Sequence, residues 1–169
     1  HAFWVVLAVS PLWGGCGKQD SPPATEPAQE IPANAALVIE IHDPAAGEFL
    51  DRSGELEVLA EGFEIAEGPV WIASRKMLLF SDVKGNKIHF WSPEKGQGVF
   101  LSPGGHTGSV PFFEGGVLGS NGLAVDSRGE LIICQHGDRR LARLSLDKVS
   151  QEGLSTLVDN FEGKRFNSP

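Results

Sequence analysis

The pattern of apolar and polar positions from about Ala36 onward predicts a series of short strands. Apolar, β-prone stretches are separated by turns of Gly, Asp, Ser or Pro, at a spacing of about eight to twelve residues. A weak helical signal covers residues 44–50, with Asp43 as its cap. The expected strands are 56–60, 70–73, 77–82, 87–91, 98–101, 123–126, 131–135, 141–144 and 155–158.

Two stretches of this pattern repeat one another. The residues from Glu67 to Phe90 superpose on those from Asn121 to Arg143 with a one-residue slip, at an offset of about 54 residues. The Gly-rich insertion Ser102–Ser120 lengthens this offset. A repeat of four short strands is typical of a β-propeller blade. The sequence therefore predicts an all-β fold in which residues 36–169 form the first two blades of a propeller and the start of a third.

Two blades cannot bury their faces against neighbours on both sides, and a propeller needs four or more blades to close. The chain begins at His1 rather than Met, and Pro169 interrupts the pattern just before a third inner strand. We therefore expect a fragment of a longer protein, and we expect this fragment by itself to be unstable or insoluble, and inactive.

The N-terminal residues differ in pattern from the rest. Residues 1–16 contain a short apolar run that fits the core of a signal peptide, followed by Trp13-Gly-Gly-Cys16, which resembles a bacterial lipoprotein cleavage box. A lipid on Cys16 would attach the protein to a membrane without a spanning helix. Residues 17–35 are polar and Pro-rich, which predicts a disordered tether. These features predict an exported lipoprotein of the bacterial cell envelope, periplasmic or anchored in the outer membrane. An ordinary signal peptide and a buried apolar strand are the alternatives.

Composition narrows the possible partners. The formal net charge is −8, which disfavours binding to a phosphate backbone, so the sequence predicts no nucleic-acid partner. The two cysteines show no Cys-x-x-Cys spacing, which argues against a structural zinc site. Cys134 lies in an apolar run and is expected to be a small buried side chain, or to form a disulfide with Cys16.

The repeat places polar side chains at one end of the predicted blades. Glu67 and Asn121 are equivalent starts of the inner strands, and Asp82 and His136 are equivalent residues of the second turn, with Arg139 next to the latter. Asp82 either caps the turn or supports a neighbouring metal ligand through a hydrogen bond. His136 is either an ordinary turn residue or a residue that lines the site. Glu, Asn and Asp oxygens at a channel mouth suit Ca²⁺ or Zn²⁺.

Several motifs in order resemble the SMP-30/gluconolactonase/regucalcin family, in its bacterial gluconolactonase branch. The resemblance covers about residues 56–169, and the motifs are Ala66-Glu-Gly-Pro-Val-Trp71, Leu78-Leu-Phe-Ser-Asp82 with Asn86-Lys-Ile88, Ser120-Asn-Gly-Leu-Ala-Val-Asp126, Cys134-Gln-His-Gly-Asp-Arg-Arg140 and Phe161-Glu-Gly-Lys-Arg-Phe-Asn-Ser-Pro169.

This resemblance implies a six-bladed propeller that hydrolyses a sugar lactone or a similar cyclic ester with one divalent cation. The family's metal-binding Glu corresponds to Glu67, and its other ligands and the general base would lie beyond Pro169. Asn121, His136 and Arg139 are candidate substrate-binding residues because they share a rim with Glu67. The alternatives are a non-enzymatic, envelope-anchored propeller that binds a partner, and a propeller similar to strictosidine synthase.

Overall fold

The computed structural model describes residues 39–51, 53–54, 57–111 and 116–169 of the chain. Two compact units divide at residue 58. The unit that begins at Leu59 contains all ten strands of the described residues, whereas residues 39–58 belong to the other unit. The segments expected to be a signal peptide and a tether, including Cys16, lie outside the described residues. No helix among the described residues is long and apolar enough to span a membrane.

The first sheet has four antiparallel strands in the order β1-β2-β3-β4. The strands are β1 (Ala66–Ile72), β2 (Met77–Asp82), β3 (Lys87–Ser92) and β4 (Gly96–Leu101). A short 3-10 helix, η2 (Ala73–Arg75), connects β1 to β2. Strands that follow one another in the chain pair with one another, which is the meander expected from the short turns.

The second sheet repeats this arrangement in the order β5-β6-β7-β8. Its strands are β5 (Ser120–Val125), β6 (Leu131–Gln135), β7 (Arg140–Leu144) and β8 (Leu154–Val158), with η3 (Gln151–Gly153) before β8. The two sheets share their irregularities: the pairing register shifts between Glu67 and Val70 in β1 and again between Ser120 and Leu123 in β5. A bulge near the start of each inner strand, within one residue of the predicted superposition, and the same order of four strands confirm the internal repeat predicted from the sequence.

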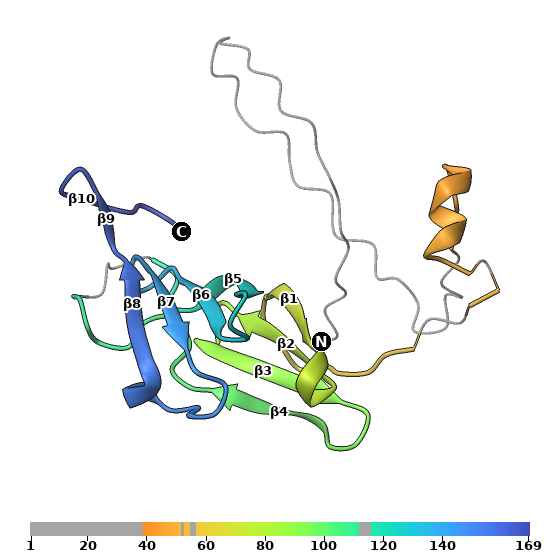
Figure 1. The fold of residues 1–169 in the computed structure, drawn as a ribbon, viewed down its shortest axis with the longest axis horizontal. Coiled ribbons are helices and arrows are strands. Elements are labelled where there is room, and N and C mark those ends of the chain that lie inside the picture. The colour runs from red at the N-terminus through yellow and green to blue at the C-terminus, as the bar shows by residue number, and fades with distance from the viewer. Residues whose placement is uncertain (1–38, 52, 55–56, 112–115) are drawn as a thin grey trace, which may run out of the picture. The chain divides into compact units, whose positions relative to one another are not determined.

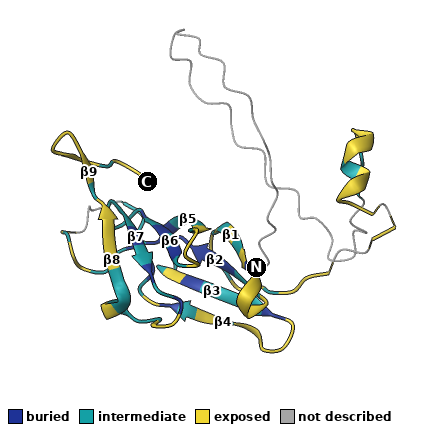
Figure 2. Cartoon of the chain, viewed as in Figure 1, coloured by how far each residue is buried: buried dark blue, intermediate teal, exposed yellow. Residues whose placement is uncertain are grey.

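One apolar cluster joins the two sheets. Leu79 and Ile88 from the first sheet and Leu131 and Ile133 from the second are fully buried within it. Figure 1 shows β1 and β5 side by side, with β4 and β8 on the outer sides of the two sheets. The middle strands β2 and β6 are the best buried, whereas β8 is largely exposed (Figure 2). Burying both faces of the middle strands explains their dense apolar sequence.

The two ends of the connection from β4 to β5 lie against each other, with Gly105 near its start in close backbone contact with Gly119 at its end. The Gly119 N–H donates to the Val83 carbonyl at 2.8 Å, and the Gly137 N–H donates to the Gly119 carbonyl at 3.4 Å. A Cβ atom on Gly105 would lie 2.0 Å from the carbonyl carbon of Gly119. Only glycine at these positions lets the segments approach so closely.

Most predicted strands are confirmed, with ends that differ by up to four residues. The strand expected at 56–60 is wrong over its described part, because residues 57–60 form no strand. The two-residue strands β9 (Asn160–Phe161) and β10 (Lys164–Arg165) form a hairpin that the apolar pattern did not predict. The weak helical signal at 44–50 corresponds to the 3-10 helix η1 (Pro44–Glu48), which Asp43 caps by accepting a hydrogen bond from the Ala45 N–H.

Candidate functional site

The starts of the two inner strands are in direct contact. Gly68, in β1, has a φ of 60°, and a Cβ atom there would lie 2.4 Å from the Asn121 carbonyl oxygen and 2.9 Å from the Gly122 Cα. The left-handed backbone and the absence of a side chain therefore bring β1 against the first residues of β5. Glu67, next to Gly68, is exposed, and Asn121 is half-buried. The predicted neighbourhood of these two strand starts is thus present.

A buried pair of hydroxyl groups fixes this contact. The Ser81 Oγ and the Ser120 Oγ lie 2.7 Å apart, and the Ser81 hydroxyl also donates to the Asn121 carbonyl at 2.8 Å. Both serines are fully buried. Because each buried hydroxyl has a partner, the pair joins the two sheets without leaving a polar group unsatisfied.

The turn between β2 and β3 is held by Asp82. Its Oδ1 accepts hydrogen bonds from the Ile65 N–H at 3.3 Å and from the Gly85 N–H at 3.2 Å. Asp82 is 6% exposed, and its Oδ2 lies 4.0 Å from the His89 Nε2. Of the two roles left open by the sequence, these contacts are those of a cap: Asp82 joins the segment before β1 to the turn after β2.

The turn between β6 and β7 is held by a buried carboxylate that the sequence did not single out. We call residues His136–Arg139 the anchor turn. Asp138 is fully buried and accepts hydrogen bonds from the Thr107 N–H at 3.0 Å and from the Thr107 hydroxyl. Its carboxylate also lies 3.3 Å from the Arg140 guanidinium and 3.3 Å from the His106 Nδ1. A buried charge with several donors is held rigidly, so this turn is a fixed point of the rim.

Asp138 could not be distinguished in the sequence from an ordinary turn aspartate. Its neighbour Gln135 did carry a signal, because it follows Leu131 and Ile133 on the inward face of β6 and is itself fully buried. The Gln135 side chain donates to the Gly104 carbonyl at 2.9 Å and accepts from Arg140 at 2.7 Å. A polar residue at an inward-facing position of a strand needs a buried hydrogen-bond partner, and for Gln135 that partner lies in the Gly-rich insertion between β4 and β5.

The three candidate substrate-binding residues contact one segment of the chain. We call residues Phe166–Pro169 the exit segment. Arg139 donates from Nε to the Phe166 carbonyl at 2.5 Å, and the His136 Nδ1 lies 2.9 Å from the Ser168 Oγ. Asn121 donates from Nδ2 to the Pro169 carbonyl at 3.3 Å. The structure therefore brings Asn121, His136 and Arg139 together around this segment. A role in substrate binding stays a prediction.

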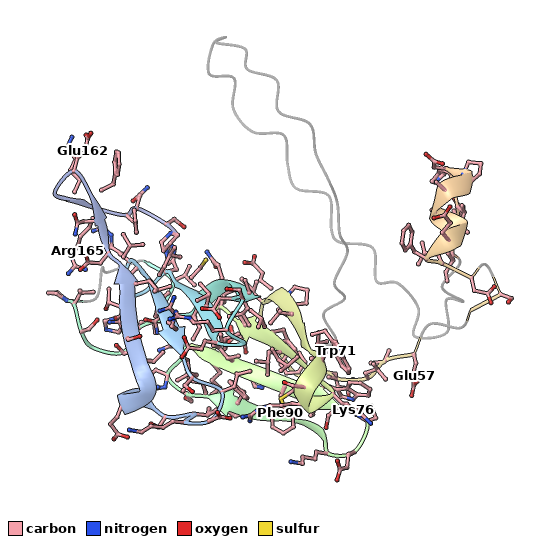
Figure 3. All side chains as sticks on the ribbon, in the orientation of Figure 1. Glu57, Trp71, Lys76, Phe90, Glu162 and Arg165 are labelled. Atoms are coloured by element: carbon pink, nitrogen blue, oxygen red, sulfur yellow. The ribbon has the colours of Figure 1, made fainter. Side chains whose placement is uncertain are left out.

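Arg165, just before the exit segment, donates a hydrogen bond to the anchor turn, whereas Arg139 donates one from that turn to the exit segment. Its Nη1 donates to the Asp138 carbonyl at 3.3 Å. Figure 3 labels Arg165 at the end of the β9–β10 hairpin nearer the sheets and Glu162 at its tip. The hydrogen bond from Arg165 thus joins the hairpin to the anchor turn, and the hydrogen bond from Arg139 joins the anchor turn to the exit segment.

The described residues do not form a complete metal site by themselves. Among them, no group of three His, Cys, Asp or Glu side chains is arranged to hold an ion. Glu67 is chemically suited to be one ligand of a cation that other residues also bind. Its carboxylate is exposed at the start of an inner strand and lies next to the contact with Asn121. Further ligands would have to come from outside the described residues.

Comparison with known proteins identifies relatives of this chain. Residues 65–168 match the family described as the SMP-30/gluconolactonase/LRE-like region. The gluconolactonase of Zymomonas mobilis subsp. mobilis is 38% identical over 126 residues, which cover 75% of this chain and 35% of that protein.

Two solved structures are also similar. One belongs to a protein assigned as a gluconolactonase, with 35% identity and a TM-score of 0.51 over 66% of this chain and 33% of that one. The other is a gluconolactonase from Xanthomonas campestris, with 30% identity and a TM-score of 0.48 over 62% of this chain and 29% of that one. The chain thus spans about a third of the length of the relatives it matches.

Proposed function

Because the chain belongs to the SMP-30/gluconolactonase/LRE-like family, we propose that the whole protein hydrolyses a sugar lactone or a similar cyclic ester. The fold is all-β, and its two four-stranded sheets are the first two blades of a six-bladed β-propeller. The placement of Glu67 carries the proposal. Its exposed carboxylate lies at the start of inner strand β1, where Gly68 packs against Asn121 at the start of the next inner strand.

We propose that Glu67 is one ligand of a single divalent cation, Ca²⁺ or Zn²⁺. Such a cation would supply Lewis-acid polarisation of the lactone carbonyl when bound. The chain's own contribution is the position of the carboxylate: the left-handed Gly68 and the Ser81–Ser120 pair fix the start of β1 against β5. A general base for the attacking water would come from beyond Pro169.

The Glu67→Gln variant of the whole protein tests this proposal. The substitution keeps the size of the side chain and removes its charge, so we expect less bound metal and a fall in kcat/KM for lactone hydrolysis by about 100-fold or more. A pH-stat assay with a sugar lactone measures the rate, and elemental analysis measures the metal. A chelator should abolish the activity of the unaltered protein, and added Ca²⁺ or Zn²⁺ should restore it.

The matched control is Glu94→Gln, which removes an exposed carboxylate from the turn between β3 and β4. That turn lies at the other end of β3 from the turn that Asp82 caps, so activity and metal content should not change. Lactone hydrolysis that persists in chelator, or in Glu67→Gln, would reject the metal-dependent mechanism. Metal binding without any lactone hydrolysis would favour the non-enzymatic propeller.

We propose further that the protein is exported and attached to the cell envelope through a lipid on Cys16. The support is the short apolar run followed by Gly14, Gly15 and Cys16 in the sequence. A polar, Pro-rich stretch after Cys16 would separate the two blades from the membrane surface.

A further inference from the structure

We propose that Asn121, His136 and Arg139 are positioning residues, which hold the exit segment against inner strand β5 and so place it at the site of lactone hydrolysis. This inference rests on the proposed function. It differs from a direct role in substrate binding, because these side chains would act on the reaction through the chain that they hold.

The three side chains belong to two separate elements, and each contacts a different residue of the exit segment. Arg139 holds the Phe166 carbonyl and His136 holds the Ser168 hydroxyl, both from the anchor turn. Asn121 holds the Pro169 carbonyl from the start of β5. Three attachments within four residues fix both the path and the direction of the chain, which a single hydrogen bond would leave free to rotate.

Within the described residues, these three side chains hold the exit segment and no sheet does. Residues 166–169 belong to no strand, and the hairpin before them has only two residues in each strand, with Phe161 71% exposed. Two-stranded hairpins are marginally stable alone in water. Among the described residues, the position of the segment is therefore set largely by the anchor turn and by Asn121.

The anchor turn is suited to this task because it is itself fixed. Asp138 is fully buried among the side chains of Thr107 and Arg140, and its carbonyl accepts a hydrogen bond from Arg165. Because the turn is fixed by buried contacts, its hydrogen bonds also restrict the motion of the exit segment.

The backbone of Arg139 supplies a second argument. Its φ is 57°, in the left-handed region where glycine is the favoured residue and where other residues carry a conformational cost. Glycine would make this turn more easily. An arginine there is explained by its guanidinium, which reaches the Phe166 carbonyl across 27 positions of sequence.

The segment lies where a small displacement would matter for the reaction. Pro169 contacts Asn121, whose own carbonyl lies against Gly68, the neighbour of Glu67. Pro169 therefore lies close to the contact between the two inner strands. Displacing reacting groups by about 1 Å can lower an enzymatic rate by about 100-fold.

A double-mutant cycle in the whole protein separates positioning from direct substrate binding. We expect His136→Ala and Ser168→Ala each to lower kcat/KM about tenfold, and the double variant to be no worse than the more severe single variant, because both remove the same contact. Arg139→Lys, which keeps a donor, should retain more activity than Arg139→Ala. Multiplying losses in the double variant, or no rescue by lysine, would overturn the proposal.

Backbone dynamics measured by NMR test the contact itself and do not depend on activity. In Arg139→Ala the backbone order parameters of Asn167 and Ser168 should fall, while those of the middle strand β6 stay high. The matched control is Arg128→Ala, which removes an exposed arginine paired with Asp126 in the turn between β5 and β6 and should leave the exit segment as ordered as in the unaltered protein. Unchanged order parameters in the exit segment of Arg139→Ala would overturn the positioning role even if the lactone is hydrolysed. A loss of order in a protein without lactone hydrolysis would uphold the contact and reject only the proposed function.

Discussion

At the scale of single residues, His89 shows how burial can outweigh a nearby charge. Its ring lies 4.8 Å from that of Phe63 and 5.8 Å from that of Phe80, and its side chain is 14% exposed. Burial lowers the pKa of His89 below its ordinary value of 6.5, although the carboxylate of Asp82 favours the protonated form. The positive charge of Lys87 acts in the same direction as burial. The folded protein therefore favours neutral His89.

This pKa predicts a loss of stability in mild acid. As the pH falls below about 6.5, the unfolded chain takes up a proton at His89 that the folded chain resists, so the unfolded state binds more protons and the free energy of unfolding decreases. The decrease continues until the pH reaches the lowered pKa of the folded state. Replacing the imidazole by His89→Leu should make the urea midpoint of the whole protein less dependent on pH between about 7.5 and about 5.5.

The control for this measurement is His42→Leu, because the His42 side chain is 87% exposed. It should leave the pH dependence of the urea midpoint as it is in the unaltered protein. An equal pH dependence in His89→Leu and in the unaltered protein would show that the acid sensitivity comes from other groups.

The sequence indicated some site residues and missed others for a physical reason. Glu67 and Asn121 could be found because they occupy equivalent positions in the repeat, and equivalent strand starts must lie at the same end of neighbouring blades. The role of Asp138 could not be found, because its partner Thr107 lies 31 positions away on the insertion. Contacts between a turn and a long irregular connection leave no periodic pattern in the sequence.

At the scale of the elements, the contact of β1 with β5 depends on one glycine. Gly68 combines a φ of 60° with a backbone approach that leaves no room for a Cβ atom. The left-handed backbone disfavours other residues by conformational strain, and the overlap of a Cβ atom with the Asn121 carbonyl leaves no room for them.

We expect Gly68→Ala to destabilise the whole protein by about 2 kcal/mol or more, the cost of a strained backbone added to an overpacked contact. Chemical denaturation measures the change in the free energy of unfolding. Gly96→Ala is a close control, because Gly96 has a φ of 64° but a Cβ atom there would have nothing within 4 Å. It should cost only the strain, about 1 kcal/mol. Equal effects of the two substitutions would mean that the close approach contributes nothing.

The strands were predictable where both faces or one face of the sheet are buried. β2 and β6 match their predicted bounds, because a dense apolar run between turn residues marks where a buried strand begins and ends. The stretch from Glu57 to Ala60 has the same local character but no partner strand within the described residues. The β9–β10 hairpin is exposed and has no apolar pattern, so its turn, with Glu162 and Gly163 in the left-handed region, is what forms it. Local pattern predicts the propensity of a strand, and tertiary pairing decides whether it forms.

At the scale of the whole molecule, the proposed lipid on Cys16 predicts where the protein resides. Cells grown with a radiolabelled fatty acid should incorporate the label into the unaltered protein and not into Cys16→Ala, because the thiol would be the site of acylation. The envelope fraction should then hold the unaltered protein, and Cys16→Ala should be lost from it.

Cys134→Ala is the matched control for this labelling. Burial raises the pKa of the Cys134 thiol, which keeps it protonated and unreactive, so its removal should leave the label unchanged. Equal labelling of Cys16→Ala and the unaltered protein would remove the lipid anchor from the proposal.

The glycine contact that closes the β4–β5 connection also makes the protein a practical carrier for added sequence. Gly105 and Gly119 pin the two ends of the connection to the core, so the chain between them can grow at a small cost in closure entropy, without moving the blades. Gly108 and Ser109 are exposed, and nothing lies within 4 Å of a Cβ atom on Gly108. An epitope or a fluorescent reporter spliced between them would be displayed on the surface while the two sheets keep their packing.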